Sequence, residues 1–355
     1  MKIHFPLTGF NLSGGVRVIT MIANGLAERD YEVRITVPRY RDQSPFTLDN
    51  RVEVRTLGEK DSSRFSYSLQ LAREAAQWGD VLVATNFKTP HILRKSVVRN
   101  HSEAKILYLV QGYEPYTQGT LYEGPFWRRW LNRRVALRGY EKADLRCYVS
   151  KGIAKRVDLD PDPCLVYPGF NPAIFSPSDE RRRDDQVQVG FIARTGRLKG
   201  AQVFTDAISR LRDLHPKIHW VVLRVGDLPP GLPNDTEILT AHNDQDMADF
   251  YRRLDIFAMP SLYEGFGLPA LEAMACGAAV VASDVDGVLE FAENEVNSIV
   301  FPTGESAALA ESLRRLILSR ELRTKLANQG IETSRRFTWA NTVDRFKEAL
   351  KRVRG

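Results

Sequence analysis

The chain has 355 residues, of which 43% are hydrophobic and 26% charged, a composition typical of a globular protein in water. A chain of this length exceeds what one ordinary hydrophobic core can accommodate, so we expect two domains. The 50 basic and 44 acidic residues give a net charge of +6, which suits nucleic acid, an anionic lipid or an anionic small substrate. No apolar run of the length of a membrane-spanning helix occurs. The segment that begins Met1–Pro6 lacks a long apolar stretch, so we do not expect a signal peptide.

The cysteine and histidine residues do not predict a metal site. Cys147, Cys164 and Cys276 form neither a CxxC pair nor a Cys/His ligand spacing, and the six histidines show no pairing at ligand spacing. An odd number of unpaired cysteines fits a reducing cytoplasm. We therefore expect a cytoplasmic protein without a structural zinc ion.

The N-terminal segment has the pattern of a βαβ unit. Lys2–Leu7 is a predicted strand, Thr8–Gly15 a glycine-bearing turn, and Val33–Val37 the next strand. The intervening helix has apolar residues at helical spacing: Val16, Ile19, Ile22, Ala23 and Leu26. The turn lacks the GxGxxG pattern and an acidic partner after the second strand, which disfavours a nicotinamide dehydrogenase. Gly14 and Gly15 are equally well explained by a tight turn or by a ligand contact.

Two further strands are predicted at Val81–Ala84 and Ile106–Val110. The second is followed by the polar and aromatic segment Gln111–Tyr116. Such a segment at the end of a parallel strand either lines a binding cleft or is an ordinary polar loop. The sequence leaves both interpretations open.

A basic segment at residues 126–142 carries six arginine or lysine residues against one acid, Glu141. Phe126, Trp127 and Trp130 lie beside the arginines. A basic helix with tryptophans can lie on an anionic membrane surface. The alternative is a solvated helix whose aromatic side chains pack inward. No nucleic-acid-binding module accompanies the charge, so nucleic acid is not an expected partner.

The boundary between the two expected domains falls where the chain changes character. Cys147–Val149 is a predicted strand, with Ser150 as the cap of the next helix. Residues 165–186 are then turn-rich and, from Ser176 to Asp185, highly charged. We place the boundary in this region, with an N-terminal domain at residues 1–168 and a second domain at residues 169–336.

The second domain begins with the strand Val187–Ala193 and the turn Arg194–Gly200. Three cations in a glycine-bearing turn, Arg194, Arg197 and Lys199, would neutralise a diphosphate at the carboxyl end of the strand. The alternative is a solvated cationic turn. A strand at residues 219–226 and a helix at residues 247–254 follow.

The most informative stretch is Tyr263–Glu272. A buried strand is predicted before it at residues 254–259, and another after it at residues 278–282. Its glycines permit positive φ or a close approach of ligand, Pro269 suits the first helical position, and Gly277 ends the helix. A helix N-terminus beside a glycine-rich turn accepts an anion, most often phosphate. Glu264 and Glu272 bracket this turn.

The tail from Glu321 to Gly355 is predicted to be helical and basic. Its final amphipathic helix starts at Thr338 and has one apolar face: Trp339, Val343, Phe346 and Leu350. That face must pack on another part of the protein.

Three of these features occur in the order found in one known family. The loop with Gly14 and Gly15, the turn Arg194–Gly200 and the EGFGLPALEA stretch resemble the retaining glycosyltransferases of family 4 type, also called glycosyl transferases group 1. The resemblance covers nearly the whole chain. It implies the GT-B fold: an α/β protein with two Rossmann-like domains whose parallel sheets face across a cleft. A C-terminal helix, here residues 337–355, would cross back to the N-terminal domain.

The resemblance also implies roles for individual residues. Arg194 and Lys199 match the pair that neutralises the donor diphosphate, and Glu264 matches the acid that holds the donor sugar. Glu272 matches the residue that binds the nucleotide ribose. Backbone N–H groups for the sugar and phosphates would come from four residues: Gly265, Phe266, Gly267 and Leu268. Gly14 and Gly15 match the loop beside the pyrophosphate.

The implied activity is that of a retaining hexosyltransferase of polysaccharide biosynthesis that needs no cofactor or metal ion. A nucleotide-diphosphate sugar would be the donor and a glycan or lipid-linked molecule the acceptor. Cations and a helix end would stabilise the leaving diphosphate in place of Mg²⁺, since no DxD carboxylate pair presents itself as a metal site. Residues 126–142 would hold the protein at the inner face of the membrane. The alternatives are a nucleotide-sugar epimerase and a non-catalytic protein that binds sugar nucleotides.

One departure from the family concerns the donor sugar. Many relatives have a histidine near the 6-hydroxyl of the sugar, whereas the matching segment here, Val110–Pro115, has none. The VQ-x-YEP pattern is similar to rhamnosyltransferase-like members. Their donor is a 6-deoxysugar, which has no 6-hydroxyl to bind.

Overall fold

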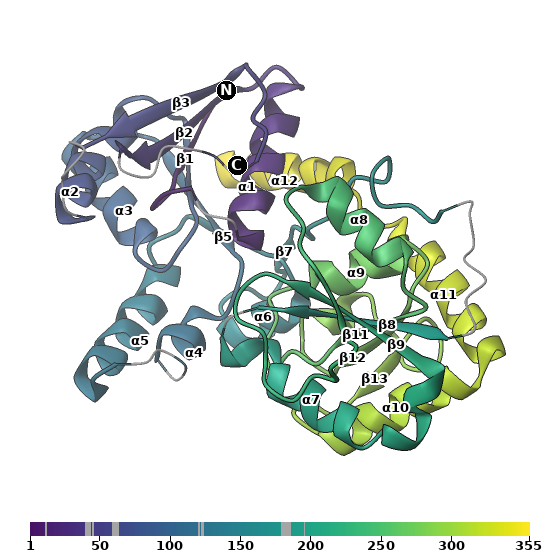
Figure 1. Ribbon diagram of the computed structural model, residues 1–355. Coiled ribbons are helices and arrows are strands. Elements are labelled where there is room, and N and C mark those ends of the chain that lie inside the picture. Colours follow the sequence, from purple (N-terminus) through teal and green to yellow (C-terminus); the bar gives the residue numbers. More distant parts are fainter. Residues whose placement is uncertain are drawn as a thin grey trace. The chain divides into compact units, whose positions relative to one another are not determined.

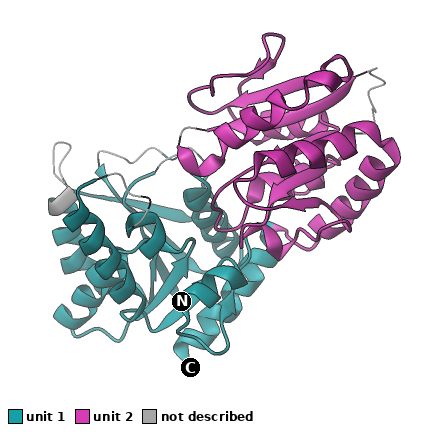
Figure 2. Cartoon of the chain, turned by 90° about the horizontal axis from the view of Figure 1, so that it is seen from below, with its two compact units in different colours: residues 1–169, 339–355 teal, residues 170–338 magenta. Residues whose placement is uncertain are grey.

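The computed structural model (Figure 1) describes residues 1–10, 13–39, 44, 46–58, 64–119, 121, 124–178, 186–194 and 196–355. Three predicted segments therefore lie partly outside the described residues: Thr8–Gly15, Ser176–Asp185 and Arg194–Gly200. The chain divides into two compact units, coloured separately in Figure 2. Unit 1 comprises Met1–Gly169 together with Trp339–Gly355, and unit 2 comprises Phe170–Thr338.

Unit 1 is built on a seven-stranded parallel sheet of order β3-β2-β1-β4-β5-β6-β7. Its strands are β1 (Lys2–Pro6), β2 (Glu32–Pro38), β3 (Val52–Leu57), β4 (Val81–Ala84), β5 (Lys105–Val110), β6 (Leu145–Tyr148) and β7 (Cys164–Leu165). Every residue of β4 is buried, as a short apolar run between parallel neighbours requires. The strands predicted near residues 2–7, 33–37, 81–84 and 106–110 are confirmed.

The helices of unit 1 connect these parallel strands. They are α1 (Gly14–Ala27), α2 (Arg64–Glu74), α3 (Thr89–Arg99), α4 (Glu114–Gly119), α5 (Phe126–Tyr140), α6 (Lys151–Val157) and α12 (Trp339–Arg354). Ser13 caps α1 by accepting the Val16 N–H at 3.4 Å, and Ser150 caps α6 as predicted by accepting the Ile153 N–H at 3.3 Å.

The C-terminal helix α12 packs on α1 within unit 1, which confirms that it crosses back to the N-terminal part of the chain (Figure 1). A Cβ at Gly25 would lie 2.4 Å from Val343 Cγ2, so only glycine lets the two helices approach this closely. Phe5 of β1 stacks on Phe346 with ring centroids 6.0 Å apart. The apolar face predicted for the last helix is therefore buried against unit 1.

Unit 2 has a six-stranded parallel sheet of order β10-β9-β8-β11-β12-β13. Its strands are β8 (Val187–Ala193), β9 (Ile218–Arg224), β10 (Glu237–Leu239), β11 (Ile256–Met259), β12 (Ala279–Ser283) and β13 (Ile299–Phe301). Numbered within the unit, this is the 3-2-1-4-5-6 order of a Rossmann sheet. The first six strands of unit 1 have the same order. The predicted Rossmann-like α/β architecture is thus confirmed for both units.

The helices of unit 2 are α7 (Ala201–Ser209), α8 (Asp244–Arg252), α9 (Leu268–Ala275), α10 (Ser306–Leu318) and α11 (Arg320–Ser334). The core between α7, α10 and the sheet contains stacked aromatic rings, with Phe191 and Phe204 centroids 4.3 Å apart. The predicted helix at residues 247–254 begins three residues earlier, because the Asn243 side chain accepts the Asp246 N–H and caps it there. Among the described helices, none combines the length and hydropathy needed to cross a bilayer.

Candidate functional site

The candidate site lies at the carboxyl edge of the sheet in unit 2. β8 and β11 are parallel neighbours, so the segments that follow them leave the same edge of the sheet. One segment is the cationic turn Arg194–Gly200, and the other is the loop Pro260–Gly267. The fold therefore brings together two motifs that are more than 60 residues apart in sequence.

Two backbone contacts hold the turn against the loop. The Leu262 N–H donates to the Leu198 carbonyl oxygen at 2.8 Å. Gly200 has φ +68°, and a Cβ at this position would lie 1.8 Å from the Pro260 carbonyl oxygen. Only glycine tolerates both the backbone conformation and the close approach. Gly200 is consequently what allows the two segments to meet.

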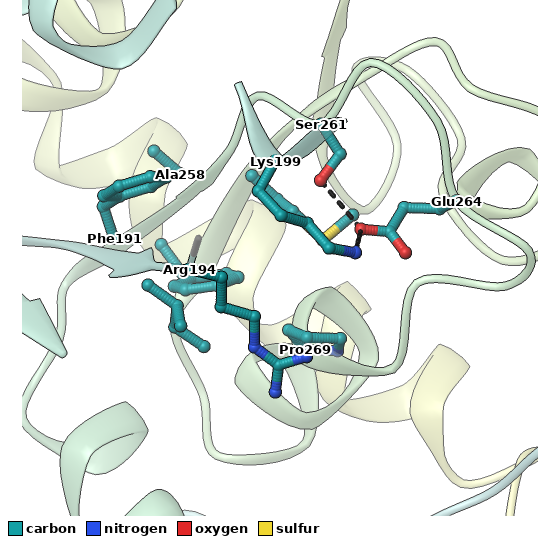
Figure 3. A pocket seen from close by; sticks show the side chains of 10 residues that line it. Phe191, Arg194, Lys199, Ala258, Ser261, Glu264 and Pro269 are labelled. Atoms are coloured by element: carbon teal, nitrogen blue, oxygen red, sulfur yellow. Dashed lines mark hydrogen bonds and ion pairs between the residues drawn. The ribbon is translucent and has the colours of Figure 1, made fainter. Parts of the chain in front are cut away.

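The side chains of the two segments also meet, at Glu264. Lys199 Nζ forms an ion pair with Glu264 Oε1 at 2.7 Å, and Ser261 Oγ donates to the same oxygen at 2.8 Å. Figure 3 shows the lysine and the serine approaching one carboxylate oxygen, with the other oxygen directed away from both. In the part of the chain that the structure describes, Glu264 Oε2 has no hydrogen-bond partner.

Arg194 lines the same pocket as Lys199, Ser261 and Glu264 (Figure 3). Its Nε is buried, and among the described residues it has no hydrogen-bond partner. A buried N–H of a charged group without an acceptor is costly, so a bound anion would stabilise it. The pocket has two positive charges, from Arg194 and Lys199, and one negative charge, from Glu264. Its net charge from these three side chains is therefore +1. The third cation of the turn, Arg197, is exposed and does not line this pocket.

Helix α9 begins at the same pocket. It starts at Leu268 after Gly267, which has φ +100°, and no side chain caps it. Pro269 is its second residue rather than the first, because the turn conformation of Gly267 places the helix start at Leu268. Cys276 and Gly277, with φ +89°, end the helix as predicted. The positive end of the helix dipole is thus placed beside the two cations. Pro269 has no N–H, and the Ala270 N–H already donates to the Gly267 carbonyl oxygen at 3.1 Å.

Other residues of unit 2 pack against the segment Gly265–Leu268. The Phe266 side chain is buried with its ring centroid 5.5 Å from that of Phe291 and 5.7 Å from that of Phe337. A Cβ at Gly287 would lie 2.5 Å from the Phe266 nitrogen, so the turn at Gly287 packs directly on this backbone. That these residues donate N–H groups to a ligand remains a prediction.

Glu272 lies on α9, is 2% exposed, and does not line the pocket. The Tyr251 hydroxyl of α8 donates to Glu272 Oε2 at 3.2 Å. Burial raises the pKa of the Tyr251 phenol, the Glu272 carboxylate raises it further, and the Arg194 guanidinium lowers it. The Tyr251–Glu272 pair therefore interacts with the pocket through Arg194. Contact of Glu272 with a ribose stays a prediction.

The predicted site residues of unit 1 lie in the first turn of α1. A Cβ at Gly14 would meet no atom within 4 Å, and one at Gly15 would lie 3.4 Å from the Gln111 side chain. Gly15 therefore packs against the segment that follows β5. That these two glycines contact a pyrophosphate remains a prediction.

The segment after β5 also contains a buried carboxyl group, Glu114. The Phe87 N–H donates to Glu114 Oε1 at 2.8 Å, and the Tyr108 hydroxyl donates to Oε2. Burial raises the pKa of Glu114 to about 7, against the lowering effect of its two hydrogen bonds. Tyr108 itself stacks on Tyr140 with centroids 5.6 Å apart. Glu114 thus anchors the segment to the sheet rather than facing an opposite charge.

Helix α5 exposes its aromatic side chains. Phe126 is 81% exposed, Trp127 64% and Trp130 51%. The Arg134 guanidinium carbon lies 4.6 Å from the centroid of the Trp130 ring. The interpretation in which these aromatic residues pack inward is therefore wrong. The helix presents arginine and aromatic side chains together to its surroundings.

Two residues of the site were not recognised from the sequence. Ser261 lies two residues after the strand predicted at residues 254–259, and Tyr251 lies in the helix predicted at residues 247–254, but neither was assigned a role. The available signal for Ser261 was its spacing of three residues from Glu264 in a loop, where serine hydroxyls often bond to nearby groups. No comparable signal marks Tyr251, since its contact with Glu272 spans 21 residues. Among the described residues, no group of three His, Cys, Asp or Glu side chains could hold a metal ion.

Comparisons with known proteins agree with this arrangement. Residues 174–333 match the family model described as glycosyl transferases group 1. The D-inositol 3-phosphate glycosyltransferase of Stackebrandtia nassauensis is 31% identical over 219 residues, which cover 53% of this chain and 49% of that protein. The protein of the same name from Saccharomonospora viridis is 37% identical over 193 residues, covering 48% and 45%. The chain thus spans about half the length of the curated relatives it matches.

Solved structures resemble the whole chain. A crystal structure of HepE from Anabaena in complex with UDP and glucose has a TM-score of 0.77 at 19% identity, covering 99% of each chain. Sucrose-phosphate synthase from Thermosynechococcus elongatus has a TM-score of 0.81 at 17% identity, covering 99% of this chain and 98% of that one. At these identities the likeness concerns the fold, which is GT-B.

Proposed function

We propose that this chain, in which residues 174–333 match the glycosyl transferases group 1 family model and which has a GT-B fold, is a retaining glycosyltransferase. It moves a sugar from a nucleotide-diphosphate-sugar donor to a glycan or lipid-linked acceptor, as a step in polysaccharide biosynthesis, without a metal ion. The observation that carries the proposal is the cluster of Arg194, Lys199 and Glu264 at the uncapped start of α9.

The charges of this cluster suit a diphosphate beside a sugar. Arg194 offers a guanidinium whose buried Nε has no acceptor among the described residues, and a phosphate oxygen would supply one. The Lys199 ammonium has three N–H groups, of which Glu264 accepts one. The others are available for phosphate oxygens. The start of α9 adds the positive end of a helix dipole.

The chemistry follows from where charge develops. The bond between the anomeric carbon and the phosphate oxygen breaks, and the electron pair goes to the leaving diphosphate. Arg194, Lys199 and the start of α9 stabilise that negative charge, which is the contribution Mg²⁺ makes in other enzymes. The acceptor hydroxyl attacks the same face of the sugar, and its proton passes to the leaving phosphate oxygen. Configuration at the anomeric carbon is thereby retained.

Glu264 acts in this scheme through position and charge. We assign to Glu264 the binding of the donor sugar's hydroxyls. No covalent intermediate with Glu264 forms in this scheme. Its carboxylate stabilises the positive character that grows on the sugar ring as the leaving group departs. We assign to Glu272 the binding of the nucleotide ribose. Gly14 and Gly15 belong to the loop of unit 1 that we place beside the pyrophosphate.

A screen of nucleotide sugars by thermal shift tests the proposal. A nucleotide-diphosphate sugar should raise the melting temperature, and the corresponding nucleoside diphosphate should do so as well, since both contain the diphosphate. The stabilising donors then enter a transfer assay with glycan and lipid-linked acceptors. Inositol phosphate belongs among these acceptors because of the names of the curated relatives. A protein that no nucleotide sugar stabilises would contradict the proposal.

Two assays distinguish the proposed function from its two alternatives. A nucleotide-sugar epimerase would convert the donor with no acceptor present, which a product assay on donor alone detects. A non-catalytic sugar-nucleotide-binding protein would retain its function after Glu264→Gln. The glycosyltransferase needs an acceptor and depends on Glu264, so each alternative has its own decisive outcome.

For the donor sugar we propose a 6-deoxyhexose such as rhamnose. The segment Val110–Pro115 contains no histidine, and its carboxylate, Glu114, is engaged by Phe87 and Tyr108. This segment thus lacks the residue that many relatives place near a 6-hydroxyl. Stabilisation by dTDP-rhamnose but not by UDP-glucose would support this donor. The reverse result would eliminate it.

We further propose that residues 126–142 hold the enzyme at the inner, anionic face of the membrane in the cytoplasm. Exposed Phe126, Trp127 and Trp130 supply the apolar contact, and the neighbouring arginines supply attraction to anionic head groups.

Vesicle co-sedimentation tests this contact. The protein should bind vesicles of phosphatidylserine and phosphatidylcholine, lose binding at high salt, and bind pure phosphatidylcholine weakly. Trp127→Ala together with Trp130→Ala should reduce binding, whereas Leu289→Ala, an exposed apolar residue of unit 2, should not. Equal binding of the tryptophan and leucine variants would show that α5 is not the contact.

A further inference from the structure

We propose that Ser261 is a positioning residue that fixes which oxygen of Glu264 is presented to the donor sugar. The inference rests on the proposed function and adds to it a residue with no assigned role. Ser261 follows β11 directly after Pro260, and its Oγ donates to Glu264 Oε1 at 2.8 Å. Figure 3 shows this contact among the side chains that line the pocket.

The two carboxylate oxygens of Glu264 have different surroundings. Oε1 accepts from Ser261 and from Lys199, at 2.8 Å and 2.7 Å. Among the described residues, Oε2 has no hydrogen-bond partner. Two donors on one oxygen define the plane of the carboxylate, so the second oxygen has a fixed direction. A hydroxyl of the donor sugar can then bind to Oε2 without competing with the protein.

Lys199 alone would not provide this orientation. Its ammonium is carried on a flexible four-carbon stem, and in the proposed function it also binds the diphosphate. When phosphate oxygens attract the ammonium, its contact with Glu264 can lengthen or rotate. Ser261 has one short side chain, is 2% exposed, and belongs to a loop anchored by the Leu262–Leu198 hydrogen bond. The serine therefore holds Glu264 while the lysine exchanges partners.

The alternative is that Ser261 is simply a buried polar residue that needs an acceptor. A matched residue separates the two explanations. Ser283 ends the adjacent strand β12, is fully buried, and its Oγ has no hydrogen-bond partner among the described residues. Ser261→Ala and Ser283→Ala remove the same atom near the carboxyl ends of two neighbouring strands, but only the first removes a hydrogen bond to Glu264.

The test is a double-mutant cycle on transfer activity with the donor found in the screen. Ser261→Ala should lower kcat about tenfold, the value of one hydrogen bond to a charged group, with a smaller change in KM for the donor. In a Glu264→Gln background the same change should alter kcat less than about twofold, because the carboxylate it orients is gone. Ser283→Ala should stay within about twofold of wild type, and Ser261→Thr should restore most of the rate.

Two outcomes overturn the proposal. If the effects of Ser261→Ala and Glu264→Gln multiply, the serine acts independently of the carboxylate. If Ser261→Ala matches Ser283→Ala in rate, the hydrogen bond has no role in catalysis. Should Ser261→Ala fail to fold, the cycle is run with Ser261→Cys, which keeps the volume but weakens the donor. In each case an active wild-type enzyme shows that the proposed function stands while the positioning role fails. If the wild-type protein binds no nucleotide sugar, both the proposed function and the positioning role of Ser261 are contradicted.

Discussion

Two carboxyl groups, one in each unit, follow parallel strands of Rossmann-type sheets, and their surroundings differ. Glu264 in unit 2 is paired with the Lys199 ammonium at 2.7 Å. Glu114 in unit 1 accepts only from neutral donors, the Phe87 N–H and the Tyr108 hydroxyl. Burial raises the pKa of Glu114 to about 7. The two units share a strand order, yet only unit 2 surrounds its carboxylate with cations.

The difference lies in the turns rather than in the strands. In unit 2 the first strand is followed by Arg194 and Lys199, whereas the sequence between β1 and α1 in unit 1, residues 7–13, contains no lysine or arginine. The first turn of a Rossmann sheet is where phosphate usually binds. This difference supports the proposal that the anionic ligand binds at unit 2. Unit 1 instead has an anchoring carboxyl group whose pKa is raised by burial.

The largest expected effect comes from neutralising Glu264. Glu264→Gln removes the charge that we propose binds the donor sugar but keeps the shape of the side chain. The kcat should therefore fall about 10²- to 10³-fold, typical for loss of one preorganised electrostatic contact. Donor affinity, measured by calorimetry, should be partly kept because Arg194 and Lys199 remain. Glu311→Gln, an exposed carboxylate on α10, serves as the control. An unchanged kcat would remove Glu264 from the mechanism.

The second effect tests how the turn is held against the loop. Gly200→Ala puts a Cβ 1.8 Å from the Pro260 carbonyl oxygen at φ +68°, so the turn must move. The backbone conformation alone costs about 1–2 kcal/mol for an L-residue, and the displaced contact adds to this. Chemical denaturation should show lower stability, and donor binding should weaken.

The matched variant for this experiment is Gly196→Ala in the same turn. Gly196 has φ +111° but no atom within 4 Å of its Cβ position. It should show the cost of backbone strain without the collision. Similar donor affinity in both variants would mean that the contact between Gly200 and Pro260 does not shape the site.

The third effect separates the two arginines of the cationic turn. Arg194→Met should weaken binding of the nucleoside diphosphate about tenfold, since it removes one charged hydrogen-bonding group from the pocket. Arg197→Met should change binding little, because Arg197 is exposed and does not line the pocket. Titration calorimetry of both variants decides this. Equal losses would indicate a general attraction by the turn rather than a specific site.

The smallest effect concerns Glu114 and appears in the pH dependence of stability. The pKa of Glu114 is raised in the folded protein from 4.5 to about 7, so ionisation is disfavoured there. Its contribution to stability is therefore greatest at low pH and is lost as the pH rises from about 4.5 to about 7. Glu114→Gln cannot ionise, and its stability relative to wild type should rise as the pH increases across this range. Denaturation at pH 5 and pH 8 measures it. A difference independent of pH would show that Glu114 is not buried as an acid.

The parts of the fold that the sequence predicts well are those with continuous apolar runs. Val187–Ala193 and Val81–Ala84 were predicted at the residues where β8 and β4 lie, because both are buried on both faces of a parallel sheet. β3 was missed because most of its residues are not buried and it lacks such a run. Helix boundaries depended on caps: Ser150 was recognised, whereas Asn243 was not.

The sequence predicts which residues belong to the site, but it does not predict which of them contact one another. Arg194, Lys199 and Glu264 were identified from motifs, and the structure brings them to one pocket. Spacing along the chain cannot show that Lys199 pairs with Glu264 or that Ser261 shares the same oxygen, since these contacts depend on two strands being neighbours. The burial of Glu272 beneath Tyr251 likewise arises from the packing of α8 on α9.

The crossing of α12 back to unit 1 has a consequence for the order in which the protein can assemble on the ribosome. Residues 170–338 are contiguous and contain the whole core of unit 2. Unit 1 is synthesised first, but Phe5 and Gly25 lack their partners Phe346 and Val343 until residues 339–354 have emerged. We therefore expect the half made first to complete its folding last, with an apolar groove beside α1 open to chaperones during translation of unit 2.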